Sequence, residues 1–286
     1  MAVVLVTGAT GFIGRATVDR LVRAGHDVHA TSRRPPGARD AVTWHVADLL
    51  REDPSDVCRA AGASTLVHLA WCVEPGQYWT SLENLDWVAA SIRLVRAFST
   101  SGGESAIAVG SAAEQHSSAL YPTAKGSLRS LLHAGAGALG LDVAWARVHQ
   151  LYGPGEAAGR LLPDVISSLL RGSPVRVSAG TQERDFVHVD DVADALVALV
   201  SNRVNGTFDV GTGRAIAVAD VVRLAAAATG GRDLIEWDAV PLRDGEPACL
   251  RADVTPLLEA TGWRAQVTIE QGISSMVASA KVDDRR

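Results

Sequence analysis

Three residues in one short stretch of the chain have the types and spacing of a proton-transfer site. In GSAAEQHSSALYPTAKG (residues 110–126), Tyr121 follows Ser111, and Lys125 stands four residues after the tyrosine. On a helix, Tyr121 and Lys125 share one face, so the ammonium is expected to lower the pKa of the phenol. Tyr121 can then exchange a proton with a carbinol or carbonyl oxygen to which Ser111 donates a hydrogen bond. The alternative is an ordinary helix that exposes both side chains.

A glycine-rich segment near the start of the chain predicts a dinucleotide-binding loop. The apolar run AVVLVTG is typical of a strand buried on both faces, and a helical pattern begins soon after it. Between them, TGATGFIG places Gly8, Gly11 and Gly14 where backbone N–H groups can approach a pyrophosphate at a helix N-terminus. The cofactor contacts predicted in this loop are Gly8, Thr10, Gly11, Phe12, Ile13 and Gly14.

The end of the second strand indicates which dinucleotide is bound. An Asp or Glu there normally accepts hydrogen bonds from an unphosphorylated ribose, but TSRRPPG offers Ser32, Arg33 and Arg34. Two guanidinium groups suit a 2′-phosphate, so NADP(H) is favoured over NAD(H), with a solvated basic loop as the alternative. Asp48, at the end of the third strand, is predicted to meet the adenine amino group, although Asp is also a common turn residue.

The elements that must position these residues alternate along the chain. Strand patterns at 2–8, 27–32, 42–49, 64–71, 105–111 and 141–148 are separated by helical patterns. This order predicts an α/β fold with a doubly wound parallel (Rossmann) sheet. Residues 1–155 are expected to form the dinucleotide-binding domain. Residues 156–286 are expected to form a smaller α/β substrate lobe, with some segments returning to the sheet.

Composition narrows the class of protein. Hydrophobic residues make up 47% and charged residues 21%, a globular balance with a net charge of −5. This charge argues against nucleic acid as a partner. Three scattered cysteines lack metal-ligand spacing and favour reduced thiols, so no metal is expected. The apolar N-terminal run is too short for a membrane span and lacks a basic flank, which favours a cytoplasmic protein without membrane attachment.

Several segments together resemble the extended short-chain dehydrogenase/reductase family of nucleotide-sugar epimerases, dehydratases and reductases. The resemblance covers nearly the whole chain in the family's order. It implies a nicotinamide cofactor on the N-terminal sheet, a nucleotide sugar under the C-terminal lobe and a homodimer. The matching segments are VTGATGFIG, ADL, VHLA, ENLDWVAASIRLV, YPTAK, ARVHQLYGPG, QERDFVHVDDVADAL, GTFDVGTG, LRDGEP and LLEATGW.

The resemblance also assigns residues on the substrate side. Arg184 in QERDF and Arg243 in LRDGEP match positions that contact the nucleotide diphosphate, where a guanidinium pairs with phosphate oxygens. His149 replaces a customary Phe and Gln150 a customary Asn, so either can touch the nicotinamide or the sugar. A histidine packed in the core is the alternative for His149. The remaining assignments are Asn84 on the substrate side, with helix capping as the alternative, and Leu49, Leu69 and Ala70 on the cofactor side.

The residues after Ser111 narrow the reaction. Dehydratases of the family follow the hydroxyl residue with Asp-Glu, and decarboxylases place a Glu two positions after it. Here Ala112 and Ala113 follow, and Glu114 falls one position late. The sequence therefore disfavours an elimination reaction and favours simple hydride transfer. Gln115 replaces a common Tyr, and the Ser111–Tyr121 segment is shorter than usual, which affects the fit of the substrate.

These patterns predict an NADPH-dependent reductase of a keto group, at C4, on a nucleotide-linked deoxysugar. An NAD-dependent nucleotide-sugar 4-epimerase is the second candidate, because such enzymes keep NAD(H) bound through the cycle and usually carry the ribose-binding acid. A non-catalytic NADP-binding regulator is the distant alternative. Such relatives lose the tyrosine or the lysine, and Tyr121 and Lys125 are both present.

Overall fold

Seven parallel strands form the central sheet of the computed structural model, which describes residues 1–37, 41–242 and 245–283. Hydrophobic β-branched residues and alanines dominate most of these strands, which suits burial on both faces. Every neighbouring pair in the sheet is parallel. In spatial order the strands are β11 (Gly206–Val210), β6 (Asp142–Val148), β5 (Ser105–Ser111), β4 (Thr65–His68), β1 (Val3–Thr7), β2 (Asp27–Ser32) and β3 (Val42–Val46).

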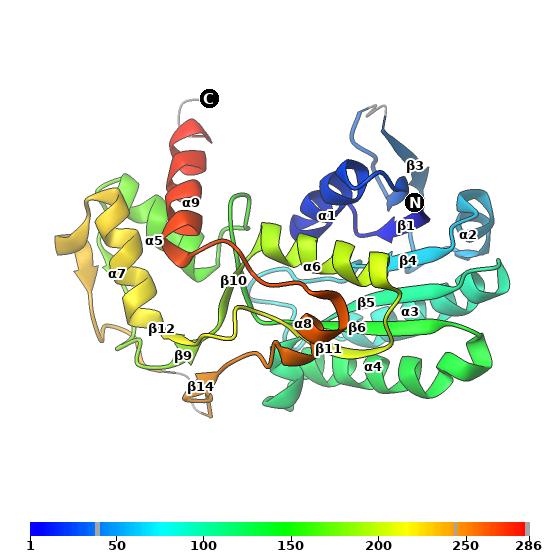
Figure 1. Cartoon of the computed structure of the whole chain (residues 1–286). Coiled ribbons are helices and arrows are strands. Elements are labelled where there is room, and N and C mark those ends of the chain that lie inside the picture. The colour runs from blue at the N-terminus through cyan, green and yellow to red at the C-terminus, as the bar shows by residue number, and fades with distance from the viewer. Residues whose placement is uncertain (38–40, 243–244, 284–286) are drawn as a thin grey trace.

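Helices cover both faces of this sheet (Figure 1). The helices α1 (Phe12–Arg23) and α6 (Val189–Asn202) pack on one face, over a core that includes Val4, Val6 and Leu196. The opposite face carries a second core, which includes Leu5, Leu66 and Trp145, under the helices α2 (Ser55–Ala61), α3 (Glu83–Thr100) and α4 (Leu120–Leu139). The predicted α/β class with a doubly wound parallel sheet is confirmed.

The C-terminal lobe has its own hydrophobic core beside the sheet. Helices α5 (Leu161–Leu170), α7 (Val218–Thr229) and α9 (Ile269–Asp283) lie together at the far end of the molecule from α2 (Figure 1). Its strands are two residues long and form two small sheets. These strands are β8 (Val175–Arg176) with β13 (Ile235–Glu236), and β9 (Glu183–Arg184) between β12 (Ile216–Ala217) and β14 (Cys249–Leu250).

The chain passes between the two parts more than once. Strand β11 and helix α6 come after the lobe begins but pack on the parallel sheet, and α8 (Thr255–Thr261) packs against β11. Strand β7 (Gln150–Tyr152) leaves the sheet directly after β6 and pairs in parallel with β10 (Phe186–His188). Two 3-10 turns, η1 (Ala112–Gln115) and η2 (Arg232–Leu234), complete the elements.

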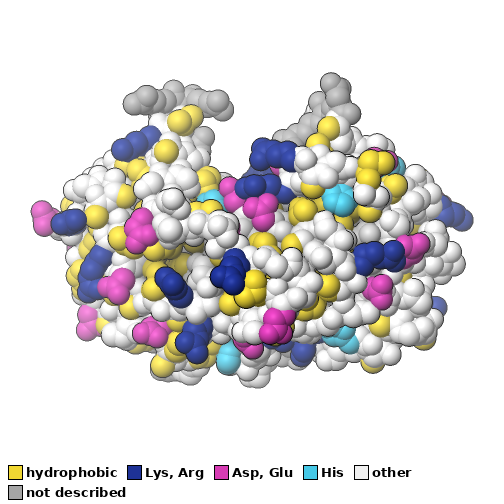
Figure 2. Space-filling view, viewed as in Figure 1, with side chains coloured by type: hydrophobic (Ala, Val, Ile, Leu, Met, Phe, Trp, Pro, Cys, Tyr) yellow, Lys and Arg dark blue, Asp and Glu magenta, His cyan; other side chains and the backbone are white. Residues whose placement is uncertain are grey.

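The surface agrees with the modest negative charge of the sequence. On the face shown in Figure 2, Arg and Lys side chains are interspersed with Asp and Glu instead of forming a continuous basic patch. No helix in the described part of the chain is both long and apolar enough to cross a bilayer.

Candidate active site

The three predicted catalytic residues lie at the carboxyl edge of the sheet. Ser111 ends β5, and Tyr121 and Lys125 lie in the first two turns of α4, which packs beside that strand. Tyr121 is 9% exposed and Lys125 is 6% exposed. The Ser111 hydroxyl lies close enough to the phenol of Tyr121 to oppose the rise in the tyrosine's pKa. Residues separated in sequence by a ten-residue segment therefore meet at one point.

Lys125 is held without a direct ion pair in the described structure. Its Nζ donates to the carbonyl oxygen of Val109 at 2.9 Å and lies 3.8 Å from the centre of the Trp71 ring. Burial lowers the pKa of Lys125 to about 7, and only the negative charge of Glu114 opposes this effect. The ammonium is thus able to lose its proton near neutral pH.

The phenol of Tyr121 behaves differently from the sequence expectation. Burial raises its pKa, and the charges of Tyr78 and Glu114 add to the rise, while Ser111 and Arg160 oppose it. The expectation that Lys125 lowers the pKa of Tyr121 is wrong for this arrangement. The ammonium is engaged by Val109 and Trp71, so it does not offset the burial of the phenol.

An aromatic wall that sequence reasoning missed surrounds Tyr121. The ring of Tyr78 meets it edge-on at 4.8 Å between centroids, and the ring of Trp79 lies 6.0 Å away. Arg160, at the start of α5, donates from Nη1 to the Tyr78 hydroxyl at 3.0 Å. The segment after β4 therefore packs beside Tyr121, next to the unusually short Ser111–Tyr121 segment. From the sequence, Trp71 and Trp79 are expected to flank the mouth after the fourth strand, with core packing favoured and stacking on a sugar or base as the alternative, but Tyr78 is not singled out.

The glycine loop has the form that a dinucleotide needs. Gly8 has φ +67°, and a Cβ there would lie 2.7 Å from the Ala70 nitrogen. A Cβ on Gly14 would lie 2.1 Å from the carbonyl oxygen of Gly8, so α1 packs closely on the strand only with glycine. Gly11 is the N-cap of α1 and has no side chain, so no side-chain hydrogen bond caps the N–H groups of the first turn. Thr10 is exposed beside this turn, and Phe12 and Ile13 begin the helix.

The other predicted cofactor residues lie along the same edge. Ser32 ends β2, and its hydroxyl oxygen accepts the Arg34 N–H at 3.1 Å, with Arg33 and Arg34 both exposed. Asp48 lies in a turn after β3, where it accepts the Leu50 N–H at 3.2 Å. The predicted third strand was too long, since β3 ends at Val46. Leu49 is buried in the core, and Leu69 and Ala70 follow β4 against the glycine loop.

His149 and Asn84 are both buried polar residues. His149 lies between β6 and β7, with Nε2 at 3.3 Å from a carboxylate oxygen of Asp209. Asn84 is 2% exposed and belongs to α3, whose N-cap is Leu82, so it does not cap the helix. Its side chain instead donates to the Tyr78 carbonyl at 2.7 Å and accepts the Trp71 Nε1–H at 2.9 Å. Asn84 thereby fixes the segment that carries the aromatic wall.

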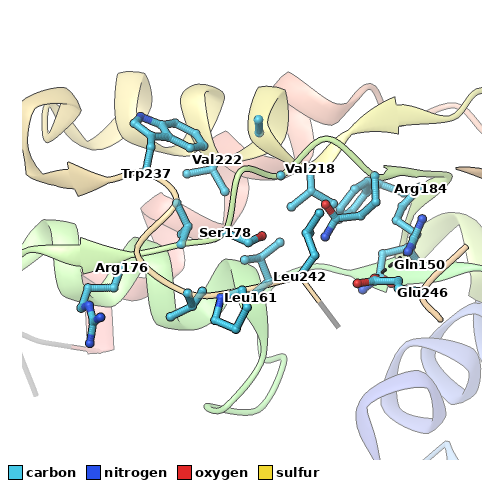
Figure 3. Close-up of a pocket in the computed structure, with 17 residues that line it drawn as sticks. Gln150, Leu161, Arg176, Ser178, Arg184, Val218, Val222, Trp237, Leu242 and Glu246 are labelled. Atoms are coloured by element: carbon cyan, nitrogen blue, oxygen red, sulfur yellow. Dashed lines mark hydrogen bonds and ion pairs between the residues drawn. The ribbon is translucent and has the colours of Figure 1, made fainter. Parts of the chain in front are cut away.

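Two of the predicted substrate residues, Gln150 and Arg184, line a pocket of about 360 Å³ in the C-terminal lobe, and Asn84 does not line it. Figure 3 shows Gln150, Arg184 and Glu246 gathered at one end and Trp237 at the other. Arg184 is 7% exposed, and its guanidinium donates to Glu246 Oε1 at 2.6 Å and to the Pro247 carbonyl at 2.9 Å. The predicted contact Arg243 lies outside the described residues. The volume lies within the ~300–1,000 Å³ typical of ligand pockets.

Comparison with known proteins gives a family match over most of the chain. A sequence profile of the NAD dependent epimerase/dehydratase family matches residues 4–211. CDP-abequose synthase of Salmonella muenchen is 25% identical over 298 residues, which cover 96% of this chain and 97% of the relative. UDP-glucose 4-epimerase of Mycolicibacterium smegmatis is 27% identical over 309 residues, covering 96% of each.

A solved structure agrees with the fold over nearly the full length. MoeE5 in complex with UDP-glucuronic acid and NAD superposes with a TM-score of 0.86 and 29% identity, covering 98% of this chain and 99% of that chain. The loop geometry at Gly8 and Gly14 and the pocket at Arg184 thus occur in a chain whose structural relative binds a dinucleotide and a nucleotide sugar.

Proposed function

Because the chain belongs to the NAD dependent epimerase/dehydratase family of nucleotide-sugar-modifying enzymes, we propose that it reduces a keto group with NADPH. The substrate is a nucleotide-linked deoxysugar, and the carbonyl that accepts the hydride is C4. The family assigns a nicotinamide dinucleotide as cofactor. The choice of NADPH, the C4 position and the deoxysugar are the proposal.

The arrangement around Ser111 carries this proposal. Ser111 lies close enough to Tyr121 to affect its pKa, and in our proposal the carbonyl oxygen accepts a hydrogen bond from both hydroxyls. The nearby acid, Glu114, is bonded to the Ser111 N–H and to the indole of Trp145. With that carboxylate directed into the protein, the segment after Ser111 presents no acid of the kind an elimination needs. The chemistry left to this site is therefore proton transfer to a carbonyl oxygen.

The residues of this chain divide the reaction between them. Tyr121 donates a proton to the carbonyl oxygen, and its raised pKa keeps the phenol protonated and ready to donate at neutral pH. Ser111 donates a hydrogen bond that stabilises the charge developing on the same oxygen. Lys125 is placed to hold the nicotinamide ribose. The nicotinamide, when bound, supplies the hydride that forms the new C–H bond.

NADPH is favoured by the end of β2. Ser32, Arg33 and Arg34 offer two exposed guanidinium groups and a hydroxyl, and no acid stands among them to accept the 2′-hydroxyl hydrogen bonds of NADH. The exposed side chains leave room for a 2′-phosphate. MoeE5, by contrast, is solved in complex with NAD.

We propose that the nucleotide binds in the lobe pocket. Arg184 and Gln150 at one end suit a diphosphate and a sugar, and the indole of Trp237 at the other end suits a base. The match to CDP-abequose synthase supports a CDP-linked sugar as the first compound to try.

The test is a spectrophotometric assay of the purified protein. A nucleotide 4-keto-6-deoxysugar with NADPH is expected to cause a ketone-dependent loss of absorbance at 340 nm. NADH is expected to be used less efficiently than NADPH. No absorbance change with CDP-, dTDP- and UDP-linked ketosugars would contradict the proposal.

A 4-epimerase is the second candidate, supported by the match to UDP-glucose 4-epimerase. An epimerase keeps its dinucleotide through the cycle. Protein that retains NAD(H) through gel filtration and interconverts two nucleotide hexoses without added cofactor would place the epimerase first. Protein that elutes without dinucleotide and needs added NADPH supports the reductase.

A further inference from the structure

Glu114 is a buried carboxylate directly beneath the predicted catalytic residues, and the proposed chemistry leaves it unused. Its side chain is 1% exposed. Oε1 accepts the backbone N–H of Ser111 at 2.7 Å, and Oε2 accepts the indole N–H of Trp145 at 3.2 Å. The Ser111 hydroxyl in turn accepts the Ala113 N–H at 3.3 Å, so the turn after β5 is bonded in both directions.

Gly110 makes room for this carboxylate, and Gly126 lies beside its side chain. A Cβ on Gly110 would lie 2.2 Å from Glu114 Oε1 and 2.1 Å from Trp145 Nε1. A Cβ on Gly126, on the neighbouring helix, would lie 3.9 Å from the Cβ and Cγ of Glu114. Glu114 therefore lies between the end of β5 and the turn of α4 that follows Lys125. The space at Gly110 is available only without a side chain.

Charged groups from several elements face this pair. Arg129 of α4 places Nε 3.5 Å from Glu114 Oε2, and Arg147 of β6 places Nε at 4.0 Å. Arg147 is shared, because its Nη1 also pairs with Asp209 of β11 at 2.8 Å. On the other side of Lys125 lie the Val109 carbonyl, the Trp71 ring and the titratable ring of His68 of β4, and Tyr121 stands one turn earlier on the same helix.

We propose that Glu114 is the positioning residue of this site: it fixes the backbone at Ser111 and is the counter-charge that favours the protonated form of Lys125. The first role follows from the 2.7 Å bond to the Ser111 N–H. The second follows from its place between the end of β5 and the turn of α4 that follows Lys125, because the bonds of Lys125 to described residues go to neutral groups. The bearing of both roles on catalysis rests on the proposed function.

The electrostatics of the pair agree with this assignment. Burial lowers the pKa of Lys125, and Glu114 is the charge that raises it. Burial raises the pKa of Glu114, which is opposed by the Ser111 N–H and by the cations of Arg147, Lys125 and Arg129. Each group therefore favours the charged form of the other. Arg129 and Arg147 partly offset the negative charge of Glu114 at Lys125. Both arginines stay in place when the charge of Glu114 is removed, so their effect on Lys125 persists.

The sequence allows a direct measurement of Lys125. Lys125 and Lys281 are the only two lysines in the chain, so ¹³Cε-lysine labelling gives two side-chain signals, and Lys281→Arg assigns them. Glu114→Gln removes the charge and retains an oxygen for the Ser111 N–H. It is expected to lower the Lys125 titration midpoint by roughly half a pH unit or more. Glu104→Gln, the same change at the exposed opposite end of β5, is the matched control and is expected to leave the midpoint in place.

Glu114→Asp separates the two roles and provides a test if the Gln variant does not fold. It keeps the charge but is one methylene shorter, so the Lys125 midpoint stays near that of the unmodified protein. The amide proton of Ser111, by contrast, exchanges with solvent faster. Two results would overturn the proposal. One is an unchanged Lys125 midpoint in a folded Glu114→Gln variant. The other is a Glu114→Asp variant whose Lys125 midpoint falls as far as it would if the charge were lost completely.

These titrations need neither substrate nor cofactor, so they remain valid if the protein proves to have another activity. If the ketone reduction is found, a further result is expected. The alkaline limb of the kcat/KM profile of Glu114→Gln should move to lower pH by the same amount as the Lys125 midpoint. A uniform loss of kcat with the limb in place would mean that the carboxylate is only structural, which contradicts the second role.

Discussion

Lys125 beside the parallel sheet and Arg184 in the C-terminal lobe are both buried cations, and the two regions surround them differently. Lys125 is bonded to a carbonyl and an indole face, with no carboxylate within ion-pair distance in the described structure. Arg184 is bonded to Glu246 and to two backbone carbonyls. The first site keeps a charge that can be lost near neutral pH. The second keeps a charge that is already paired.

This difference suits the separate tasks that we assign to the two regions. A group close to proton transfer is useful when its charge depends on its surroundings, as the lowered pKa of Lys125 indicates. A cation that binds a diphosphate is useful when its charge is constant. A carboxylate can hold that cation in place until phosphate oxygens replace the carboxylate. Glu246 is in the position to be replaced, because it lines the same pocket as Arg184.

Removing the phenol hydroxyl should have the largest effect. Tyr121→Phe is expected to lower kcat for the ketosugar by about 10²–10⁴, because the proton donor is lost, while KM changes little. Steady-state kinetics at 340 nm measure both constants. Tyr152→Phe is the matched control, since Tyr152 is another buried tyrosine and packs in the core of the lobe. A Tyr121→Phe enzyme with unchanged kcat would remove the chemistry from this region.

The opposite pattern is expected in the lobe. Arg184→Leu should raise KM for the nucleotide sugar by about 10- to 100-fold with little change in kcat, because charge-assisted hydrogen bonds contribute ~1.5–3 kcal/mol. Arg203→Leu, which breaks an exposed ion pair with Glu104, provides the control. If Arg184→Leu lowered kcat and left KM unchanged, the division between the two regions would fail.

The titration of Lys125 should appear in the stability of the protein. Its pKa is about 7 in the folded protein and about 10.5 when unfolded, so between these values the unfolded chain binds more protons. The contribution of Lys125 to the free energy of unfolding therefore rises as the pH increases above 7. In urea titrations from pH 7 to 9, the folded protein should gain free energy of unfolding relative to Lys125→Met. Parallel curves for the two proteins would show that Lys125 does not titrate there, and Lys281→Met serves as control.

The smallest effect concerns the pairing of Arg184. Glu246→Gln removes the carboxylate that a diphosphate displaces, so CDP or UDP should bind about 2- to 5-fold more tightly, as expected for a partly exposed ion pair worth ~0.2–1 kcal/mol. Isothermal titration calorimetry measures this change. Weaker binding would mean that Glu246 contacts the nucleotide itself instead of competing with it.

The sequence predicted the placement of the residues in the sheet region better than their electrostatics. Gly8, Gly14 and the Ser111, Tyr121 and Lys125 set follow local rules of spacing, so the structure brings them to one edge as expected. The pKa changes depend on burial by side chains from other elements, such as Tyr78, and spacing along the chain does not carry that information.

The lobe was harder to predict for a different physical reason. Its paired strands are two residues long, which is too short for a period of two to appear in the sequence. Two partners of Arg184, Glu246 and Pro247, come from a segment more than sixty residues away, so the Arg184–Glu246 pair could not be foreseen from either motif alone. The short Ser111–Tyr121 segment was noticed, but the aromatic residues that pack beside it come from the loop after β4.

Transfer of deuterium from the cofactor to the sugar tests the central claim most directly. The enzyme is incubated with a nucleotide 4-keto-6-deoxysugar and NADPH that carries deuterium at C4 of the nicotinamide, in both stereochemical forms. Our account predicts that one form gives a product with a single deuterium at sugar C4, detected by mass spectrometry and NMR, and that Tyr121→Phe slows its appearance. Turnover without deuterium in the product, or no turnover at all, would contradict the account.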